Sequence, residues 1–210
     1  MKRKTLKKLI VFVCTGNTCR SPMAEYIFRK KAEEMGLVKL KVASAGTHAK
    51  KGDKINEKSA EILRNKGFDT VTFQAKPVDE RVLKQSLAIV CMTDAQRDML
   101  MEMRWQVLRA AGEEEIENNV YSFSEITGYQ VMDPYGKDIS CYQYVYELIE
   151  GGMSALADKL LPEPIRKKLR ETPKTNTTKK TAQKKPQTQK NKGVAKNITN
   201  KNTNKKGEKK

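Results

Sequence analysis

Residues 9–25 read LIVFVCTGNTCRSPMAE, and the architecture can be worked out from this stretch. The run at 9–13 is β-branched and aromatic throughout, which predicts a strand buried on both faces, as in a parallel sheet. Ser21 and Pro22 suit the N-cap and the first position of a helix, which we expect over 23–35. The polar loop between strand and helix then lies at the carboxyl edge of the sheet, where such sheets bind ligands.

The rest of the chain repeats this alternation of apolar runs and helical patterns. We predict further strands at 40–43, 87–92 and 120–123. We predict further helices at 57–66, 78–85, 95–103 and 141–161. Strands that alternate with helices imply right-handed crossovers and a parallel α/β sheet covered on both faces.

The pattern is ambiguous in two places. The stretch 104–119 fits either an insertion or an extension of the helix before it, a helix that Thr93 or Asp94 can cap. Gly151 and Gly152 are expected to weaken the middle of the last helix, because glycine in a helix interior costs about 1 kcal/mol relative to alanine.

The basic charge is concentrated at the C-terminal end. The formal net charge of the 210 residues is +17, and residues 171–210 contain 13 lysines and 2 glutamates. This segment is poor in large apolar residues, so we expect it to be disordered. We therefore predict one domain over 1–170 and a basic tail over 171–210. The tail is expected to associate with nucleic acid or an acidic partner, or to be a solvated segment that aids solubility.

The cysteine content and the apolar runs bear on location. Four cysteines do not make a disulfide scaffold in a chain of this length. The apolar run at 9–13 is too short for the core of a signal peptide, and no run approaches the ~18 apolar residues of a membrane span. We predict a protein of the reducing cytoplasm with free thiols.

The loop after the first strand carries the candidate chemistry. Cys14 ends the strand and Arg20 follows six residues later, so the residues between them can curl with their N–H groups facing one point. Gly16 is expected to relieve the unusual backbone angle that this requires. Such a nest at a helix N-terminus binds anions and stabilises a thiolate, while the Arg20 guanidinium can hold two phosphate oxygens. The alternative for Cys14 is a buried structural thiol, but the strand–loop–helix setting favours a nucleophile that attacks phosphorus.

The thirteen residues 13–25 resemble the signature of the low-molecular-weight protein tyrosine phosphatase family. Ser44-Ala-Gly46 and Asp133-Pro-Tyr135 continue the match, and the similarity extends across roughly 8–161. The resemblance implies a flavodoxin-like fold with a four-stranded parallel sheet, phosphorylated proteins as substrates, and no metal or other cofactor.

The resemblance also implies a role for each matched residue. Cys14 corresponds to the nucleophile that forms a phosphocysteine intermediate, and Arg20 to the phosphate clamp. Asp133 corresponds to the general acid of the first step and the base of the second. Tyr135 corresponds to an aromatic wall beside the substrate. The remaining matched residues bind phosphate or support the loop: Thr15, Gly16, Asn17, Thr18, Cys19, Ser21 and Ser44.

Two of these residues, and a third in a neighbouring loop, also have plainer interpretations. Cys19 matches a thiol able to form a reversible disulfide with Cys14, although packing of the loop would also explain it. Asp133 precedes a proline in a polar loop and would otherwise be a turn residue. His48 falls where relatives often have an aromatic residue, and it fits either a substrate contact or an exposed loop histidine.

Thr18 bears on which phosphorylated side chain is the substrate. Tyrosine-directed members of the family usually carry an apolar residue there, often Ile, whereas the branch that contains bacterial protein arginine phosphatases has CTGNTCR, as residues 14–20 do. The resemblance therefore implies phosphoarginine, with phosphotyrosine as the alternative. Two further readings are an arsenate reductase, which would need two relay cysteines besides Cys14, and a non-catalytic phosphate- or RNA-binding protein.

Overall fold

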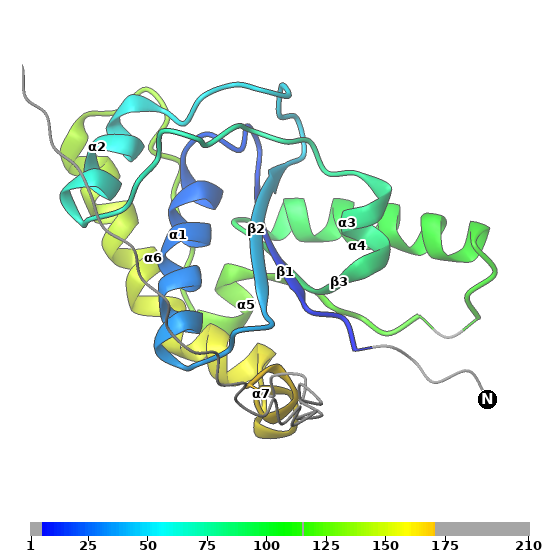
Figure 1. Cartoon of the computed structure of the whole chain (residues 1–210). Coiled ribbons are helices and arrows are strands. Elements are labelled where there is room, and N and C mark those ends of the chain that lie inside the picture. The colour runs from blue at the N-terminus through cyan, green and yellow to red at the C-terminus, as the bar shows by residue number, and fades with distance from the viewer. Residues whose placement is uncertain (1–5, 115, 171–210) are drawn as a thin grey trace, which may run out of the picture. The chain divides into compact units, whose positions relative to one another are not determined.

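A computed structural model describes residues 6–114 and 116–170, which contain a four-stranded parallel sheet (Figure 1). The strands lie side by side in the order β2-β1-β3-β4 and pair in parallel throughout. Their bounds are β1 Leu9–Cys14, β2 Lys41–Gly46, β3 Ser86–Cys91 and β4 Val120–Ser122. This order and the helical crossovers are those of a flavodoxin-like fold, as the sequence predicted.

Helices cover both faces of this sheet. On one face, α1 and α6 pack together over the inward side chains of β1 and β3, among them Phe12 and Val90. On the other face, Val13 and Ile89 pack with residues of α3 and α4. The side chains of alternate strand residues therefore pack into two separate cores, which explains the uninterrupted apolar run of β1. The helices are α1 Arg20–Glu34, α2 Glu57–Asn65, α3 Glu80–Gln85, α4 Asp94–Ala110, α5 Phe123–Thr127, α6 Ile139–Leu160 and α7 Glu163–Arg170.

The start of α1 differs from the prediction. The helix begins at Arg20, its N-cap is Cys19 without a side-chain cap, and Ser21 lies inside the first turn. Ser21 is therefore not the cap. Its hydroxyl is directed toward the Cys14 thiol, a contact between residues seven positions apart that capping preferences cannot reveal.

The ambiguous stretch 104–119 is in part an extension of the helix before it, as far as Ala110. Thr93 caps α4 through its side chain, and the helix continues to Ala110 before the chain turns toward β4. The short helices α5 and α7 were not predicted. Helix α5 begins with a reciprocal capping box between Ser122 and Glu125, a pattern that the sequence does contain.

Helix α6 runs without interruption through its two glycines, contrary to the expected weak point. A Cβ at Gly152 would overlap the ring of Phe123, the first residue of α5. The absence of a side chain lets α5 and α6 approach closely, so packing offsets the poor helix propensity of glycine.

Three predictions from the sequence remain to be considered: the basic tail, the absence of a membrane span and the cytoplasmic location. The basic tail over 171–210 lies outside the described residues, so the division at residue 170 stays a prediction. No helix within 6–114 and 116–170 has the length and apolar character needed to cross a membrane. Cytoplasmic location also stays a prediction.

Candidate active site

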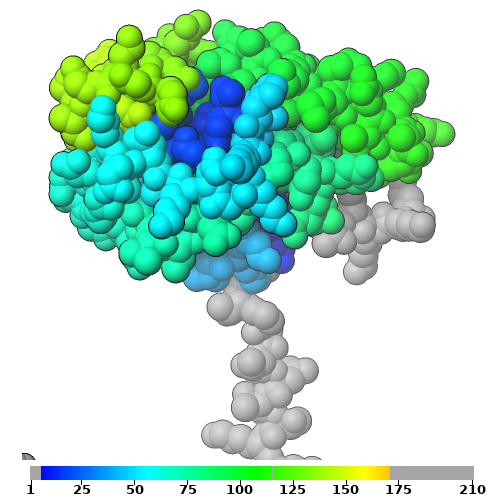
Figure 2. All heavy atoms as spheres, turned by 90° about the horizontal axis from the view of Figure 1, so that it is seen from above, coloured from blue at the N-terminus to red at the C-terminus, as the bar shows by residue number. Residues whose placement is uncertain are grey.

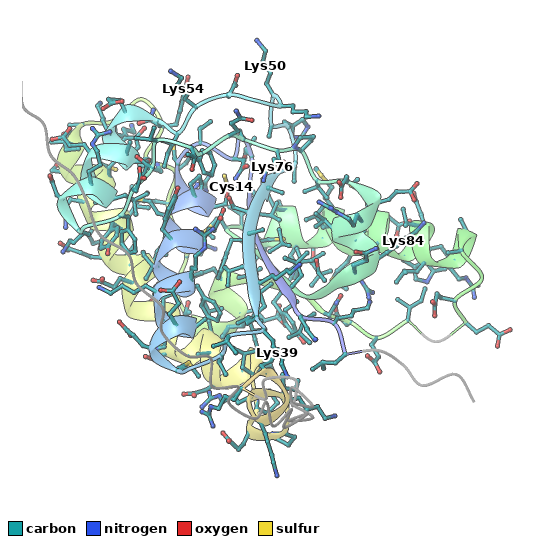
Figure 3. The ribbon with its side chains drawn as sticks, viewed as in Figure 1. Cys14, Lys39, Lys50, Lys54, Lys76 and Lys84 are labelled. Atoms are coloured by element: carbon teal, nitrogen blue, oxygen red, sulfur yellow. The ribbon has the colours of Figure 1, made fainter. Side chains whose placement is uncertain are left out.

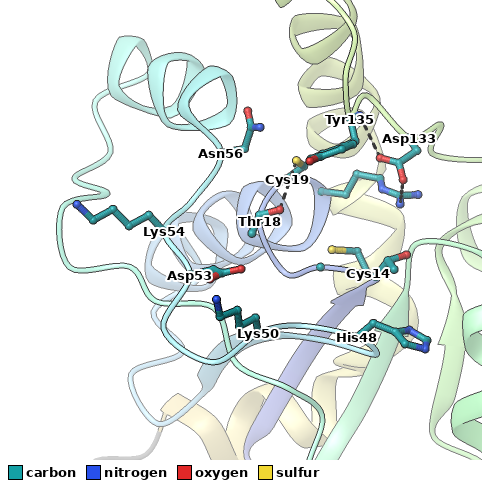
Figure 4. Close-up of a pocket in the computed structure, with 13 residues that line it drawn as sticks. Cys14, Thr18, Cys19, His48, Lys50, Asp53, Lys54, Asn56, Asp133 and Tyr135 are labelled. Carbon is teal, nitrogen blue, oxygen red and sulfur yellow. Dashed lines mark hydrogen bonds and ion pairs between the residues drawn. The ribbon is translucent and has the colours of Figure 1, made fainter.

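A cavity of about 550 Å³ opens at the carboxyl edge of the sheet (Figure 4). Three segments line it: the loop 14–20, the segment 47–56 between β2 and α2, and residues 133–135 ahead of α6. Seen from above in Figure 2, the blue atoms of the loop lie between yellow-green atoms on one side and light-blue to cyan atoms on the other. The predicted residues that line this one cavity are Cys14, Thr15, Gly16, Thr18, Cys19, Arg20, Asp133 and Tyr135.

The backbone of the loop is held from outside the cavity. The N–H groups of Thr47 and His48 donate to the carbonyls of Cys14 and Thr15, each at 2.9 Å. The Asn56 N–H donates to the Thr18 carbonyl, also at 2.9 Å. By contrast, no N–H of residues 15–19 donates to another group in the described part of the chain. The loop thus presents unpaired donors at the N-terminus of α1, which is the arrangement of an anion-binding nest.

Asn17 holds the loop together from behind. It is completely buried, and its Nδ2 donates to the hydroxyls of Ser21 at 3.0 Å and Ser44 at 2.8 Å. Its Oδ1 accepts the Lys76 N–H at 2.8 Å. Asn17 also has the positive φ of the loop, 53°, so the expectation that Gly16 would carry the unusual angle was wrong. Asparagine tolerates the left-handed region, which frees Gly16 from that role.

Gly46 is required at the end of β2 by a close approach. A Cβ there would lie 2.5 Å from the Thr15 carbonyl oxygen and 2.8 Å from the Asn17 nitrogen. The Ser-Ala-Gly motif therefore supports the loop twice, through the Ser44 hydroxyl and through the missing side chain of Gly46. Ser44 in turn donates to Glu25 Oε2 at 2.6 Å.

Asn17→Ala is expected to lower the free energy of unfolding by about 2–4 kcal/mol, because it removes three buried hydrogen bonds and leaves a positive φ on a residue with a Cβ. Urea unfolding followed by circular dichroism measures this. Asn17→Gly loses the same bonds without the strain, so it should be less destabilising by about 1 kcal/mol. An alanine variant as stable as the parent would show that these contacts do not hold the loop.

The Cys14 thiol lies at the floor of the cavity. Its Sγ is 3.0 Å from Ser21 Oγ. The single hydrogen of the Ser21 hydroxyl can turn to this sulfur or to the Ala45 carbonyl, 3.3 Å away. Since the Ser21 oxygen already accepts from Asn17, its hydrogen is available to a thiolate at Cys14.

Arg20 and Asp133 meet across the cavity although 113 residues separate them. Arg20 Nη2 lies 2.6 Å from Asp133 Oδ2, and Nη1 donates to the Val131 carbonyl at 3.5 Å. The Arg20 Nε is buried and has no partner within the described residues. Asp133 also accepts the Tyr135 N–H at 3.2 Å, and half of its side chain is exposed. The guanidinium is thus held at the mouth of the nest and still has an N–H group available to a phosphoryl oxygen.

Cys19 differs from Cys14 in its surroundings. Its Sγ lies 3.7 Å from both the Thr18 and the Tyr142 hydroxyl oxygens. Burial raises the pKa of Cys19, although the hydrogen bonds from these two hydroxyls act in the opposite direction. Tyr142 is buried and closes this side of the loop.

The other two cysteines do not reach the cavity. Cys91 is completely buried in β3, where burial raises its pKa to about 12, and Cys141 lies on α6. All four cysteines are free thiols. The relay of thiols that an arsenate reductase would need is therefore not assembled beside Cys14.

Several supporting residues were missed by sequence reasoning. Gln96, in the first turn of α4, donates from Nε2 to the Thr15 hydroxyl at 3.0 Å. Its position after β3 at the carboxyl edge of the sheet was an available signal. Lys50, Asp53 and Lys54 line the cavity from the segment 47–56, as does the exposed His48. Within the described residues, no cluster of three His, Cys, Asp or Glu side chains could hold a metal ion.

Comparison with known proteins agrees with this geometry. A protein-arginine-phosphatase of Bacillus subtilis is 31% identical over 154 residues, which are 72% of this chain and 95% of that protein. The low molecular weight protein-tyrosine-phosphatase PtpB of Staphylococcus haemolyticus is 33% identical over 66% of this chain and 89% of its own length. A solved structure of the arginine phosphatase YwlE matches with a TM-score of 0.64 at 28% sequence identity, and the match covers 75% of this chain and 99% of that one. That structure is a cysteine-to-serine mutant with a phosphorylated active-site serine. The sequence profile of the low molecular weight phosphotyrosine protein phosphatases matches residues 9–171, and the chain belongs to that family.

Proposed function

We propose that this enzyme hydrolyses phosphorylated protein side chains through a phosphocysteine intermediate and prefers phosphoarginine to phosphotyrosine. The observation that carries the proposal is the cavity in which the Cys14 thiol lies beneath unpaired loop N–H groups, with Arg20 and Asp133 at its side. The serine phosphorylated in the related arginine phosphatase structure supports covalent chemistry at the corresponding place in that protein.

In the first step, the Cys14 thiolate attacks phosphorus and the bond to the leaving nitrogen or oxygen breaks. The N–H groups of residues 15–19 and the Arg20 guanidinium stabilise the charge on the phosphoryl oxygens. Asp133 donates its proton to the leaving atom, so a neutral side chain departs and phosphocysteine remains.

In the second step, Asp133, now a carboxylate, takes a proton from a water molecule as that water attacks phosphorus. The P–S bond breaks, inorganic phosphate leaves, and the Cys14 thiolate and the protonated Asp133 are restored. Without substrate, Arg20 binds Asp133 at 2.6 Å. Phosphoryl oxygens compete for the same guanidinium, which releases the carboxyl group for proton transfer.

The preference for phosphoarginine rests on the polarity of the cavity wall. The Thr18 side chain lines the cavity and offers a hydroxyl oxygen to a guanidine N–H. The segment 47–56 contributes His48 and lysines there and no large aromatic ring. Phosphotyrosine is the second candidate because of Tyr135, which lines the cavity and is 72% exposed. Its ring is accessible to the aromatic ring of a substrate.

Thr18→Ile is expected to shift the ratio of kcat/KM for phosphoarginine over phosphotyrosine peptides toward phosphotyrosine by about tenfold. The substitution removes one hydrogen-bonding oxygen from the cavity and adds apolar bulk. Parallel assays of two peptides that differ in the phosphorylated residue alone measure the ratio. Thr72→Ile, at an exposed position outside the cavity, is the control. An unchanged ratio in Thr18→Ile would remove Thr18 from the specificity argument.

Two further parts of the proposal concern partners and location. We infer phosphorylated proteins as the substrates of the domain. Association of the tail 171–210 with nucleic acid or an acidic partner, and residence in the cytoplasm, are proposals that rest on composition alone.

A further inference from the structure

The segment 47–56 forms one wall of the cavity and is rich in cationic side chains. It contains three lysines and a single carboxylate, Asp53. Lys50, Asp53 and Lys54 all line the cavity that contains Cys14. None of these three side chains makes a hydrogen bond or ion pair within 6–114 and 116–170. Two ammonium groups in the wall of the cavity are therefore available to a ligand.

The backbone of this wall is held in place, unlike that of an ordinary surface loop. The Gly52 N–H donates to the Ala75 carbonyl at 2.9 Å, and the Ala75 N–H donates to the Asp53 carbonyl at 2.8 Å. The bonds from Thr47, His48 and Asn56 to the phosphate loop secure its two ends. The lysine side chains thus start from fixed positions relative to Cys14.

The direction of these side chains suits a polypeptide rather than the phosphoryl group. Figure 3 shows Lys50 and Lys54 projecting from the upper edge of the molecule, above Cys14. In Figure 4, Lys54 points away from Cys14, whereas Asp53 points into the cavity. When a phosphorylated side chain is bound at Cys14, the backbone of that residue lies at the mouth of the cavity. Residues on either side of the phosphorylated one then pass beside the two lysines.

We propose that Lys50 and Lys54 form a docking surface for acidic residues that flank the phosphorylated side chain in a protein substrate. The inference rests on the proposed phosphatase function and narrows its substrate class. Each exposed ion pair changes affinity by about 1.4- to 5-fold, so two pairs favour an acidic substrate by about 2- to 25-fold. Asp53, with the opposite charge, reduces this preference.

The test compares phosphopeptides that carry Glu or Gln on both sides of the phosphorylated residue, in a phosphoarginine and a phosphotyrosine series. The quantity measured is the ratio of kcat/KM for the Glu peptide over the Gln peptide at low ionic strength. General attraction of the phosphoryl dianion cancels in this ratio, because both peptides carry it. The ratio should exceed 2 in the parent enzyme and fall toward 1 at high salt, where exposed charges are screened.

Substitutions of the two lysines and of Asp53 test whether these charges determine the ratio. Lys50→Ser/Lys54→Ser should bring the ratio close to 1, and Asp53→Asn should raise it above that of the parent. Lys39→Ser/Lys84→Ser removes the same charge from positions outside the cavity and should leave the ratio unchanged (Figure 3). A parent ratio of 1 or less, or a ratio that survives in Lys50→Ser/Lys54→Ser, overturns the proposal. So does competition by single-stranded RNA at these lysines without any preference among peptides.

Binding separates this proposal from the proposed function. Fluorescence anisotropy of the same labelled peptides on Cys14→Ser gives a Glu-to-Gln affinity ratio that needs no turnover. If neither peptide series is hydrolysed but the binding ratio responds to the lysines as expected, the docking surface stands and the proposed reaction fails. If hydrolysis proceeds and neither ratio responds, the docking surface is refuted alone.

Discussion

Cys14→Ser should lower kcat for phosphopeptides and for p-nitrophenyl phosphate by about 10⁴-fold or more. The nest of N–H groups at the N-terminus of α1 can stabilise a thiolate, which is a far better nucleophile than a serine hydroxyl. An alkoxide is also a poor leaving group in the second step. A phosphoserine at position 14 should therefore accumulate slowly, and intact-protein mass spectrometry after incubation with substrate would detect it.

The control for this variant is Cys141→Ser, which removes a thiol on α6 that does not line the cavity. It should retain the parent rate. Thermal unfolding of both variants checks that the fold is kept. Undiminished hydrolysis in Cys14→Ser would refute a mechanism that proceeds through this sulfur.

Asp133→Asn should lower kcat by about 10²- to 10⁴-fold for substrates whose leaving group must be protonated, because asparagine keeps the size of the side chain but has no acidic proton. Phosphoarginine belongs to this class, since the departing guanidine nitrogen needs a proton as the P–N bond breaks. The loss should be much smaller for p-nitrophenyl phosphate in the first step, because p-nitrophenolate leaves without protonation. Burst kinetics with both substrates separate the two steps.

Binding of inorganic phosphate distinguishes loss of the acid from loss of the site. Asp133→Asn removes the carboxyl group that lies 2.6 Å from Arg20 and competes with phosphate for it, so inhibition by phosphate should persist or become stronger. Asp98→Asn, an exposed substitution on α4, is the matched control and should retain the parent kcat. Equal losses for both leaving groups in the first step would show that Asp133 does not act as the general acid.

Much of the fold and part of the site could be predicted because their signals are local. The apolar run of β1 reports burial on both faces, and the alternation of strands and helices restricts the topology to a parallel sheet. The spacing from Cys14 to Arg20, just ahead of a helix, places a thiol and a guanidinium at one anion site. Asp133 was found through a resemblance, because nothing in its own neighbourhood distinguishes it from a turn residue.

What the amino-acid order could not reveal depends on contacts between residues far apart in the chain. Asn17 takes the positive φ because its side chain is bonded to Ser21, Ser44 and the Lys76 N–H. Gly152 is tolerated in α6 because the Phe123 ring occupies the space that a Cβ would need. The salt bridge of Arg20 with Asp133 and the position of two lysines above Cys14 likewise exist once β1, β2 and the start of α6 have come together. Local preferences act within a few residues, whereas these features arise from steric fit and charge across the folded domain.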